Sequence, residues 1–337
     1  MEPVDENIAI QPVWHTWHRP VLERINSLKS QQCLPHAILI DSNSELDGVE
    51  FIWGLAMLLL CDEAVDTEPC GKCQSCQLML ANTYPDFKYV SLEYDKKSKK
   101  LNKNIKIEQI RNLIHEVNLT GLYDKLKIFA IHPADKMNKE SANSLLKTLE
   151  EPGERVLILL LTHKKGKLPV TVRSRCQIWS IEHPSREDSQ YWLLGQGMDT
   201  DEIDQYLDYA GGDPQLALKL QSEGYADIVN QFKAQFAQYL RNEIDVATLG
   251  AKLVSIGAPL VRRLMKMVIT AYSHQLCGVK GTENKLSASA KLSAQGVLAL
   301  STQIDRQLMI EENNLNFQIQ LEDVLISLKQ IIKRSKD

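Results

Sequence analysis

Four cysteines in one short segment constrain this chain most, because their spacing restricts how the backbone around them can fold. The pattern C-x8-C-x2-C-x2-C is formed by Cys61, Cys70, Cys73 and Cys76. Four thiolates surround Zn²⁺ tetrahedrally at about 2.3 Å, and two-residue gaps let successive cysteines turn back toward the same ion. We therefore expect a structural Zn²⁺ site within residues 61–76, with no open position for a substrate.

Two other interpretations of the cysteines remain. An iron–sulfur cluster also takes four cysteines, but the bacterial-type run has a longer final gap and a proline after the last cysteine, where Gln77 stands here. The cysteines could also be free thiols. Zinc is favoured, because clustered cysteines in a chain without a secretion signal indicate metal ligation more than disulfides.

Length and charge limit the classes of protein to consider. The chain has 337 residues, which predicts two or three domains. Its formal net charge of -4 gives no general attraction to DNA or to a membrane surface. No stretch reaches the roughly 18 apolar residues of a membrane span, and Met1–Ile10 lacks the apolar segment of a secretion signal. We therefore expect a cytoplasmic protein with no membrane partner.

A strand–helix–strand unit occupies the middle of the chain. Leu126–Ile131 and Val156–Thr162 are apolar runs typical of parallel strands that are covered on both faces. Between them, Asn138 is placed to cap a helix that Pro152–Gly153 ends. A further strand is expected at Gln177–Ile181. The pattern predicts a parallel α/β domain.

The chain has the setting of a phosphate-binding loop without its chemistry. A strand at His36–Ile40 leads through the turn Asp41–Gly48 into an apolar helix at Val49–Leu60. A working loop needs several glycines and a lysine, but this turn has one glycine, no lysine and three carboxylates. His132–Pro133 stands where a hydrolysing ATPase needs an acidic pair, and Asp135 is expected to be a turn or capping residue rather than a metal ligand. We expect this chain to bind no ATP.

From Pro184 onward the sequence is mainly helical. Three short helices are expected at residues 187–194, 200–210 and 214–220, with long amphipathic segments from about residue 227. The large apolar surface of these segments suits either a bundle core or contacts with other subunits.

Two motifs complete a resemblance to a known family. Ser141–Pro152 contains LLKTLEEP, and Ser174–Cys176 reads SRC. With the cysteine spacing and the altered phosphate loop, they make the chain similar to the bacterial DNA polymerase III delta-prime subunits, in the clamp-loader branch of AAA+ proteins. The resemblance is closest from His36 to Ile181. It implies a RecA-like α/β AAA+ module at 1–182 with its zinc module at 61–76. A three-helix lid at 183–226 and a helical collar at 227–337 would follow.

The resemblance also implies a function. Delta-prime subunits do not hydrolyse ATP. They help ATP-driven subunits of the DNA polymerase III clamp loader to place the sliding clamp on primed DNA. Their partners are the motor ATPase subunit and the delta subunit in a pentameric ring, within the DNA-directed DNA polymerase III holoenzyme.

Arg175 matches the arginine finger of that family, which reaches the ATP of a neighbouring subunit. Such a finger is worth about 10³ to 10⁵ in rate. A lysine would replace it poorly, because only a guanidinium offers a planar fork to two phosphate oxygens. The other interpretation of Arg175 is a surface salt bridge.

Two alternative functions remain. The chain could be an active clamp-loader ATPase with an aberrant loop, which magnesium-dependent ATP binding by the isolated chain would indicate. It could also be a zinc-dependent DNA-binding module that uses residues 61–76 and the basic run Lys96–Lys103, which salt-sensitive DNA affinity would indicate.

Overall fold

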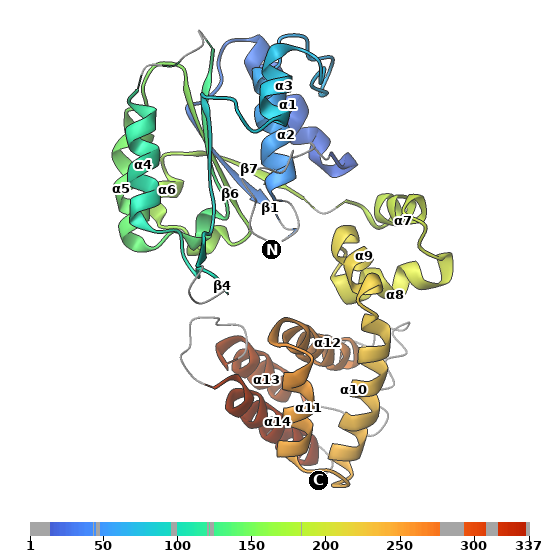
Figure 1. Cartoon of the computed structure of the whole chain (residues 1–337). Helices are drawn as coiled ribbons and strands as arrows, with labels where there is room; N and C mark the ends of the chain where they lie inside the picture. Colours follow the sequence, from blue (N-terminus) through green and yellow to red (C-terminus); the bar gives the residue numbers. More distant parts are fainter. Residues whose placement is uncertain are drawn as a thin grey trace. The chain divides into compact units, whose positions relative to one another are not determined.

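A computed structural model shows two compact units, Met1–Ser189 and Gln190–Asp337 (Figure 1). The structure describes residues 14–42, 44, 48–95, 100–119, 121, 125–182, 184–276, 293–307 and 316–334. None of the helices within these ranges is long and apolar enough to cross a membrane.

The first unit contains a five-stranded sheet in which every pair of neighbours is parallel, in the order β2-β5-β6-β1-β7. The strands are β1 (Ala37–Ser42), β2 (Phe87–Val90), β5 (Lys127–Ile131), β6 (Val156–Thr162) and β7 (Gln177–Ile181). β1, β5 and β6 are buried along their whole length, as expected of strands covered on both faces. The expected parallel α/β domain is confirmed.

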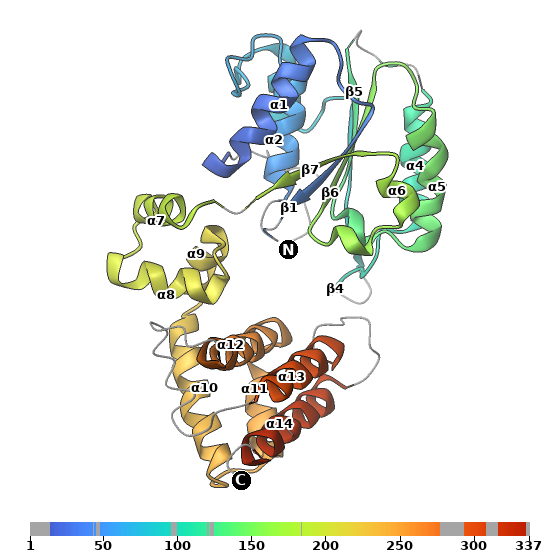
Figure 2. The ribbon, with the colours of Figure 1, turned by 180° about the vertical axis from the view of Figure 1, so that it is seen from behind.

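Helices cover both faces of this sheet, with α4, α5 and α6 on one face and α1 and α2 on the other (Figure 2). The helices of the first unit are α1 (Arg19–Ser30), α2 (Val49–Leu60), α3 (Gln74–Leu80), α4 (Ile107–Val117), α5 (Lys139–Glu150) and α6 (Val170–Arg173). Ile158 and Leu160 of β6 pack in one cluster with Leu145 of α5. Their neighbours in β6 point to the opposite face, because side chains alternate along a strand.

Short elements complete the first unit. The 3₁₀ turns are η1 (Thr16–His18), η2 (Ala134–Lys136) and η3 (Lys165–Lys167). β3 (Tyr94–Asp95) pairs antiparallel with β4 (Lys100–Leu101), which belongs to the basic run Lys96–Lys103. Residues 96–99 of that run lie outside the described residues.

Local signals in the sequence fix where α5 begins and ends. The Asn138 side chain accepts a hydrogen bond of 2.8 Å from the Ser141 backbone N–H, which satisfies one free donor of the first turn. The helix ends at Glu150, two residues before Pro152, whose ring cannot continue a helix. Both predicted boundary signals are confirmed.

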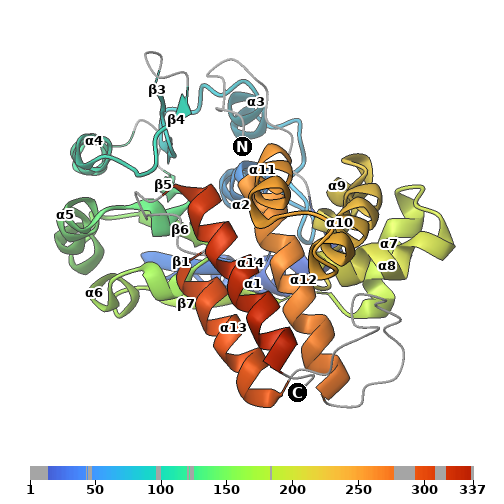
Figure 3. The ribbon, with the colours of Figure 1, turned by 90° about the horizontal axis from the view of Figure 1, so that it is seen from below.

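The second unit is helical in its described residues. Its helices are α7 (Arg186–Gly195, which begins in the first unit), α8 (Thr200–Ala210), α9 (Pro214–Ser222), α10 (Tyr225–Leu240), α11 (Val246–Ser255), α12 (Ala258–Leu276), α13 (Ala294–Gln307) and α14 (Phe317–Arg334). α13 lies beside both α12 and α14 (Figure 3).

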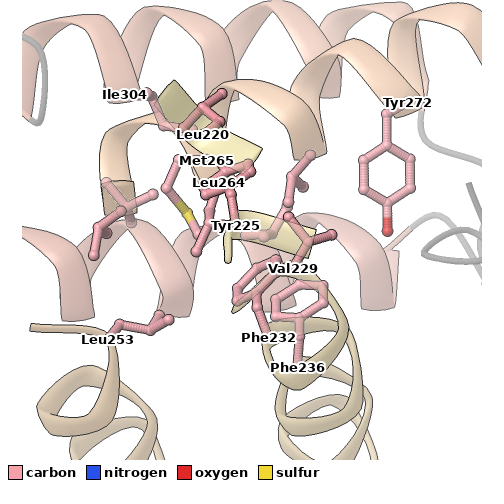
Figure 4. Packing of buried hydrophobic residues seen from close by; sticks show 14 of the residues in the cluster. Leu220, Tyr225, Val229, Phe232, Phe236, Leu253, Leu264, Met265, Tyr272 and Ile304 are labelled. Carbon is pink, nitrogen blue, oxygen red and sulfur yellow. The ribbon is translucent and has the colours of Figure 1, made fainter. Parts of the chain in front are cut away.

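One hydrophobic cluster runs through this unit (Figure 4). Phe232 and Phe236 stack in α10 with ring centroids 5.5 Å apart. The same cluster contains Leu220 from the expected lid and Leu253 from the expected collar. The expected helices are confirmed, while the division into a lid and a collar at residue 226 stays a prediction.

Candidate metal centre and candidate arginine finger

The four cysteines of the C-x8-C-x2-C-x2-C pattern come together in space. Cys61 follows the last residue of α2, Cys70 lies in the loop, Cys73 caps α3 and Cys76 lies in its first turn. Their four sulfurs all lie within 4.8 Å of one another. No disulfide joins them.

The sulfur positions fit one tetrahedral ion. Sulfurs at about 2.3 Å from a tetrahedral Zn²⁺ lie about 3.8 Å from one another. The Sγ atoms of Cys70 and Cys76 are 3.9 Å apart, and those of Cys61 and Cys73 are 4.0 Å apart. A four-iron cluster would hold each sulfur on a different iron and would spread the sulfurs further. The four cysteines can therefore hold a single metal ion.

Backbone N–H groups surround these sulfurs. The N–H of Cys70 donates to Cys61 Sγ at 3.3 Å, that of Cys73 to Cys70 Sγ at 3.3 Å, and that of Cys76 to Cys73 Sγ at 3.5 Å. Donated hydrogen bonds from Lys72 and Cys73 lower the pKa of Cys70 to about 6. Burial raises the pKa of Cys76, so this thiol needs a cation beside it to ionise.

Two lysines tie the cysteine loop to the rest of the first unit. Lys29 of α1 donates to the Cys61 carbonyl oxygen at 3.2 Å. Lys125, just before β5, donates to Asp62 Oδ1 at 2.5 Å and to Ser75 Oγ at 2.7 Å. Lys29 and Lys125 thus hold the cysteine loop against α1 and β5, an arrangement that suits a site that stabilises the fold.

The edge of the sheet at which β1, β5 and β6 end, called the carboxyl edge below, is where parallel α/β proteins bind ligands. Here His132, directly after β5, lies between two partners. Its Nδ1 is 3.1 Å from the Tyr89 hydroxyl, and its Nε2 is 3.0 Å from Nε2 of His163, which follows β6. Three side chains of this chain therefore hydrogen-bond to one another at this edge.

Carboxylates at the carboxyl edge are also paired. Asp135 Oδ1 accepts from the Thr162 hydroxyl at 2.9 Å and from the His163 N–H at 3.3 Å, which agrees with its predicted role as a turn residue. Asp41 was expected in the turn, but β1 extends through Ser42 and includes it. There Asp41 forms an ion pair with Lys165, whose Nζ lies 2.7 Å from Asp41 Oδ2. Asn43 and residues 45–47 of the expected turn lie outside the described residues.

Arg175 lies between α6 and β7, the strand at one end of the sheet order. Its side chain is 31% exposed and forms an ion pair with Glu150. Its Nε donates to Glu150 Oε1 at 2.7 Å, and its Nη1 to the Thr171 carbonyl oxygen at 2.8 Å. The salt bridge of the alternative interpretation is therefore present, and part of the Arg175 side chain also reaches solvent.

Glu150 is the residue that the sequence did not reveal. It lies 25 positions before Arg175, in the helix of the LLKTLEEP motif. Nothing in the local pattern distinguishes Glu150 from its neighbour Glu151 as the partner of an arginine. Only the packing of α5 beside α6 brings Glu150 to Arg175.

Comparison with known proteins supports the resemblance. The model of the family described as DNA polymerase III, delta subunit matches residues 17–185. DNA polymerase III subunit delta' of Haemophilus influenzae is 32% identical over 229 residues, covering 67% of this chain and 67% of that protein. The same subunit of Pseudomonas aeruginosa is 31% identical, covering 61% of this chain and 62% of that protein.

A solved structure of a DNA polymerase III gamma subunit-related protein from Thermotoga maritima superposes with a TM-score of 0.48 at 15% identity, over 91% of this chain and 99% of that chain. A similarity at that level adds nothing to the assignment. The family match covers half of the chain, and the Haemophilus relative exceeds 30% identity over two thirds of it. The chain therefore belongs to the DNA polymerase III delta-prime family.

Proposed function

We propose that this chain is a non-hydrolysing subunit of a clamp loader, which donates Arg175 to ATP held by a neighbouring motor subunit. In a pentameric ring with motor and delta subunits, it would help to load the sliding clamp onto primed DNA. The observation that carries the proposal is the contrast between two sites. The described part of the carboxyl edge is occupied by side chains of this chain, whereas Arg175 reaches the surface.

The chemistry at Arg175 is electrostatic. A guanidinium beside the transferred phosphoryl group neutralises the charge that develops there, and such a finger contributes about 10³ to 10⁵ in rate. Val170 and Ile178, on either side of Arg175 in the chain, are 67% and 44% exposed. An apolar surface next to a cation suits contact with another subunit.

The carboxyl edge supports the absence of ATP hydrolysis by this chain. His132 and its partners stand where an acidic residue would hold magnesium, and Asp41 already neutralises Lys165. We propose that the four cysteines hold a structural Zn²⁺. We also propose that residues 183–226 and 227–337 serve as lid and collar, the collar joining the ring.

The test compares complexes assembled with the wild-type chain, Arg175→Ala, Arg175→Lys and Arg111→Ala. Arg111, an exposed arginine of α4, is the matched control because its loss changes the charge equally. We expect the Arg175→Ala chain to assemble normally. The steady-state ATPase of its complex should fall by at least the fraction that the site contacted by Arg175 contributes. Arg175→Lys should restore little, because an ammonium lacks the planar fork. ATPase equal to wild type in the Arg175→Ala complex would remove the finger role.

A further inference from the structure

One contact of Arg175 has no place in phosphoryl transfer. Both Nε and Nη2 of its guanidinium donate to the same oxygen, Oε1 of Glu150. Nη1 donates to the Thr171 carbonyl oxygen at 2.8 Å. The side of the guanidinium that is formed by Nε and Nη2 is therefore occupied by a carboxylate from the same chain.

We propose that Glu150 is a latch, which holds Arg175 against its own subunit until the triphosphate of a neighbour displaces it. The inference rests on the proposed function, since it requires Arg175 to serve a nucleotide outside this chain. Carboxylate and phosphate oxygens accept from the same N–H groups of a guanidinium, so the two acceptors compete. A guanidinium that still carries its carboxylate partner offers little net charge to a phosphoryl group. Arg175 can therefore bind the neighbour's triphosphate only after it has separated from Glu150.

The exposure of the pair makes such an exchange feasible. Half of the Glu150 side chain and 31% of the Arg175 side chain reach solvent, so water screens their attraction. An ion pair of this kind favours the state in which Arg175 is bound to Glu150 over the separated state by about two- to fivefold. A triphosphate with its higher charge competes effectively against it. The Thr171 carbonyl can keep Nη1 in place while the carboxylate leaves, because it belongs to the backbone of the adjacent helix α6.

The first experiment measures how accessible Arg175 is in the isolated full chain. The wild type, Glu150→Gln and Glu151→Gln are treated with phenylglyoxal, and modification of each arginine is followed by peptide mass spectrometry. Glu151 is the matched control, because it is exposed and has no ion pair within the described residues. We expect Arg175 to react about two to five times faster in Glu150→Gln only. Arg111, which is exposed in α4, serves as an internal reference. Equal Arg175 rates in all three chains would overturn the latch.

The second experiment uses the assembled complex and separates a latch from a positioning contact. A latch predicts that Glu150→Gln lowers the KM for ATP at the served site, by up to about fivefold, without lowering kcat. Unchanged KM and kcat would overturn the proposal. So would a fall in kcat like that of Arg175→Ala, because Glu150 would then orient the finger during reaction.

The two proposals can fail separately. The phenylglyoxal result depends only on the isolated chain, whereas the finger role depends on the ATPase of the Arg175→Ala complex. Glu150 can therefore prove to hold Arg175 even where the arginine serves no nucleotide.

Discussion

If the four cysteines hold Zn²⁺ as proposed, loss of the ion should destabilise the first unit and leave the second unchanged. The perturbation is chelation, or the substitution Cys76→Ser. Cys76 is fully buried, and its sulfur lies 3.9 Å from that of Cys70. A hydroxyl at this position is a poor ligand for Zn²⁺, so the variant should lose the ion. All four ligands belong to the first unit.

The magnitude follows from binding linkage. An ion that binds only the folded state at a free concentration 100 times its Kd stabilises that state by about 2.7 kcal/mol. The first unit spans 189 residues. For a unit of that size, each kcal/mol shifts Tm by about 2 to 4 °C. Chelation should therefore lower the Tm of the first unit by about 5 to 11 °C.

The assay combines metal analysis with hydrogen exchange. We expect about one zinc ion per purified chain and a marked loss in Cys76→Ser. After chelation, exchange should rise in α2, α3 and the loop between them, with no change in α10–α14. Cys33→Ser is the control, because Cys33 is exposed and lies outside the cluster. Iron in place of zinc, or a Tm that chelation does not move, would refute the reasoning.

Three further predictions concern the carboxyl edge, the helical core and a helix cap. Isothermal titration of the isolated chain with Mg-ATP should show no binding, because Asp41 and His132 are engaged with other side chains; a submillimolar Kd would contradict this. Phe232→Ala should cost about 3 to 5 kcal/mol in urea unfolding, because the ring is buried and stacked, and a loss under about 1 kcal/mol would contradict the packing. Asp245 caps α11, and hydrogen bonds from the side chain and backbone of Thr248 lower its pKa below 3.8. The ionised cap therefore stabilises the fold fully above pH 3.8, and this stabilisation is lost as the pH falls through the lowered pKa. In an NMR titration, Thr248→Val should move this pKa back toward 3.8, and an unchanged value would show that the hydroxyl contributes nothing.

The elements of the fold could be predicted because their signals are local. Val156–Thr162 is a strand with the predicted limits, since seven consecutive apolar residues suit a position covered on both faces. Val49–Leu60 is likewise the predicted helix. α3 was not predicted, although it contains Cys76 and is capped by Cys73, because it is only seven residues long. Helices this short lack a clear periodic pattern.

Pairings between distant residues could not be predicted. Asp41 was predicted to lie in a turn that contains no lysine. In the structure it forms an ion pair with Lys165, which is 124 positions later in the chain and is brought close by the pairing of β1 with β6. His132 and His163 are neighbours only because β5 and β6 run parallel in register and end at the same edge. Strand order decides such contacts, and it is set by the packing of the whole sheet.

The sequence alone determined most of the chain's helices and strands, its family resemblance and the candidate ligands Cys61, Cys70, Cys73 and Cys76, because their signals lie in short stretches of the chain. The tertiary structure decided how the sulfurs are spaced, what occupies the carboxyl edge and that Glu150 rather than Glu151 holds Arg175. The physical reason is the distance along the chain over which each interaction acts. Local backbone preferences act over a turn of helix or a single strand, whereas an ion pair such as Glu150–Arg175 depends on how separate elements pack against one sheet.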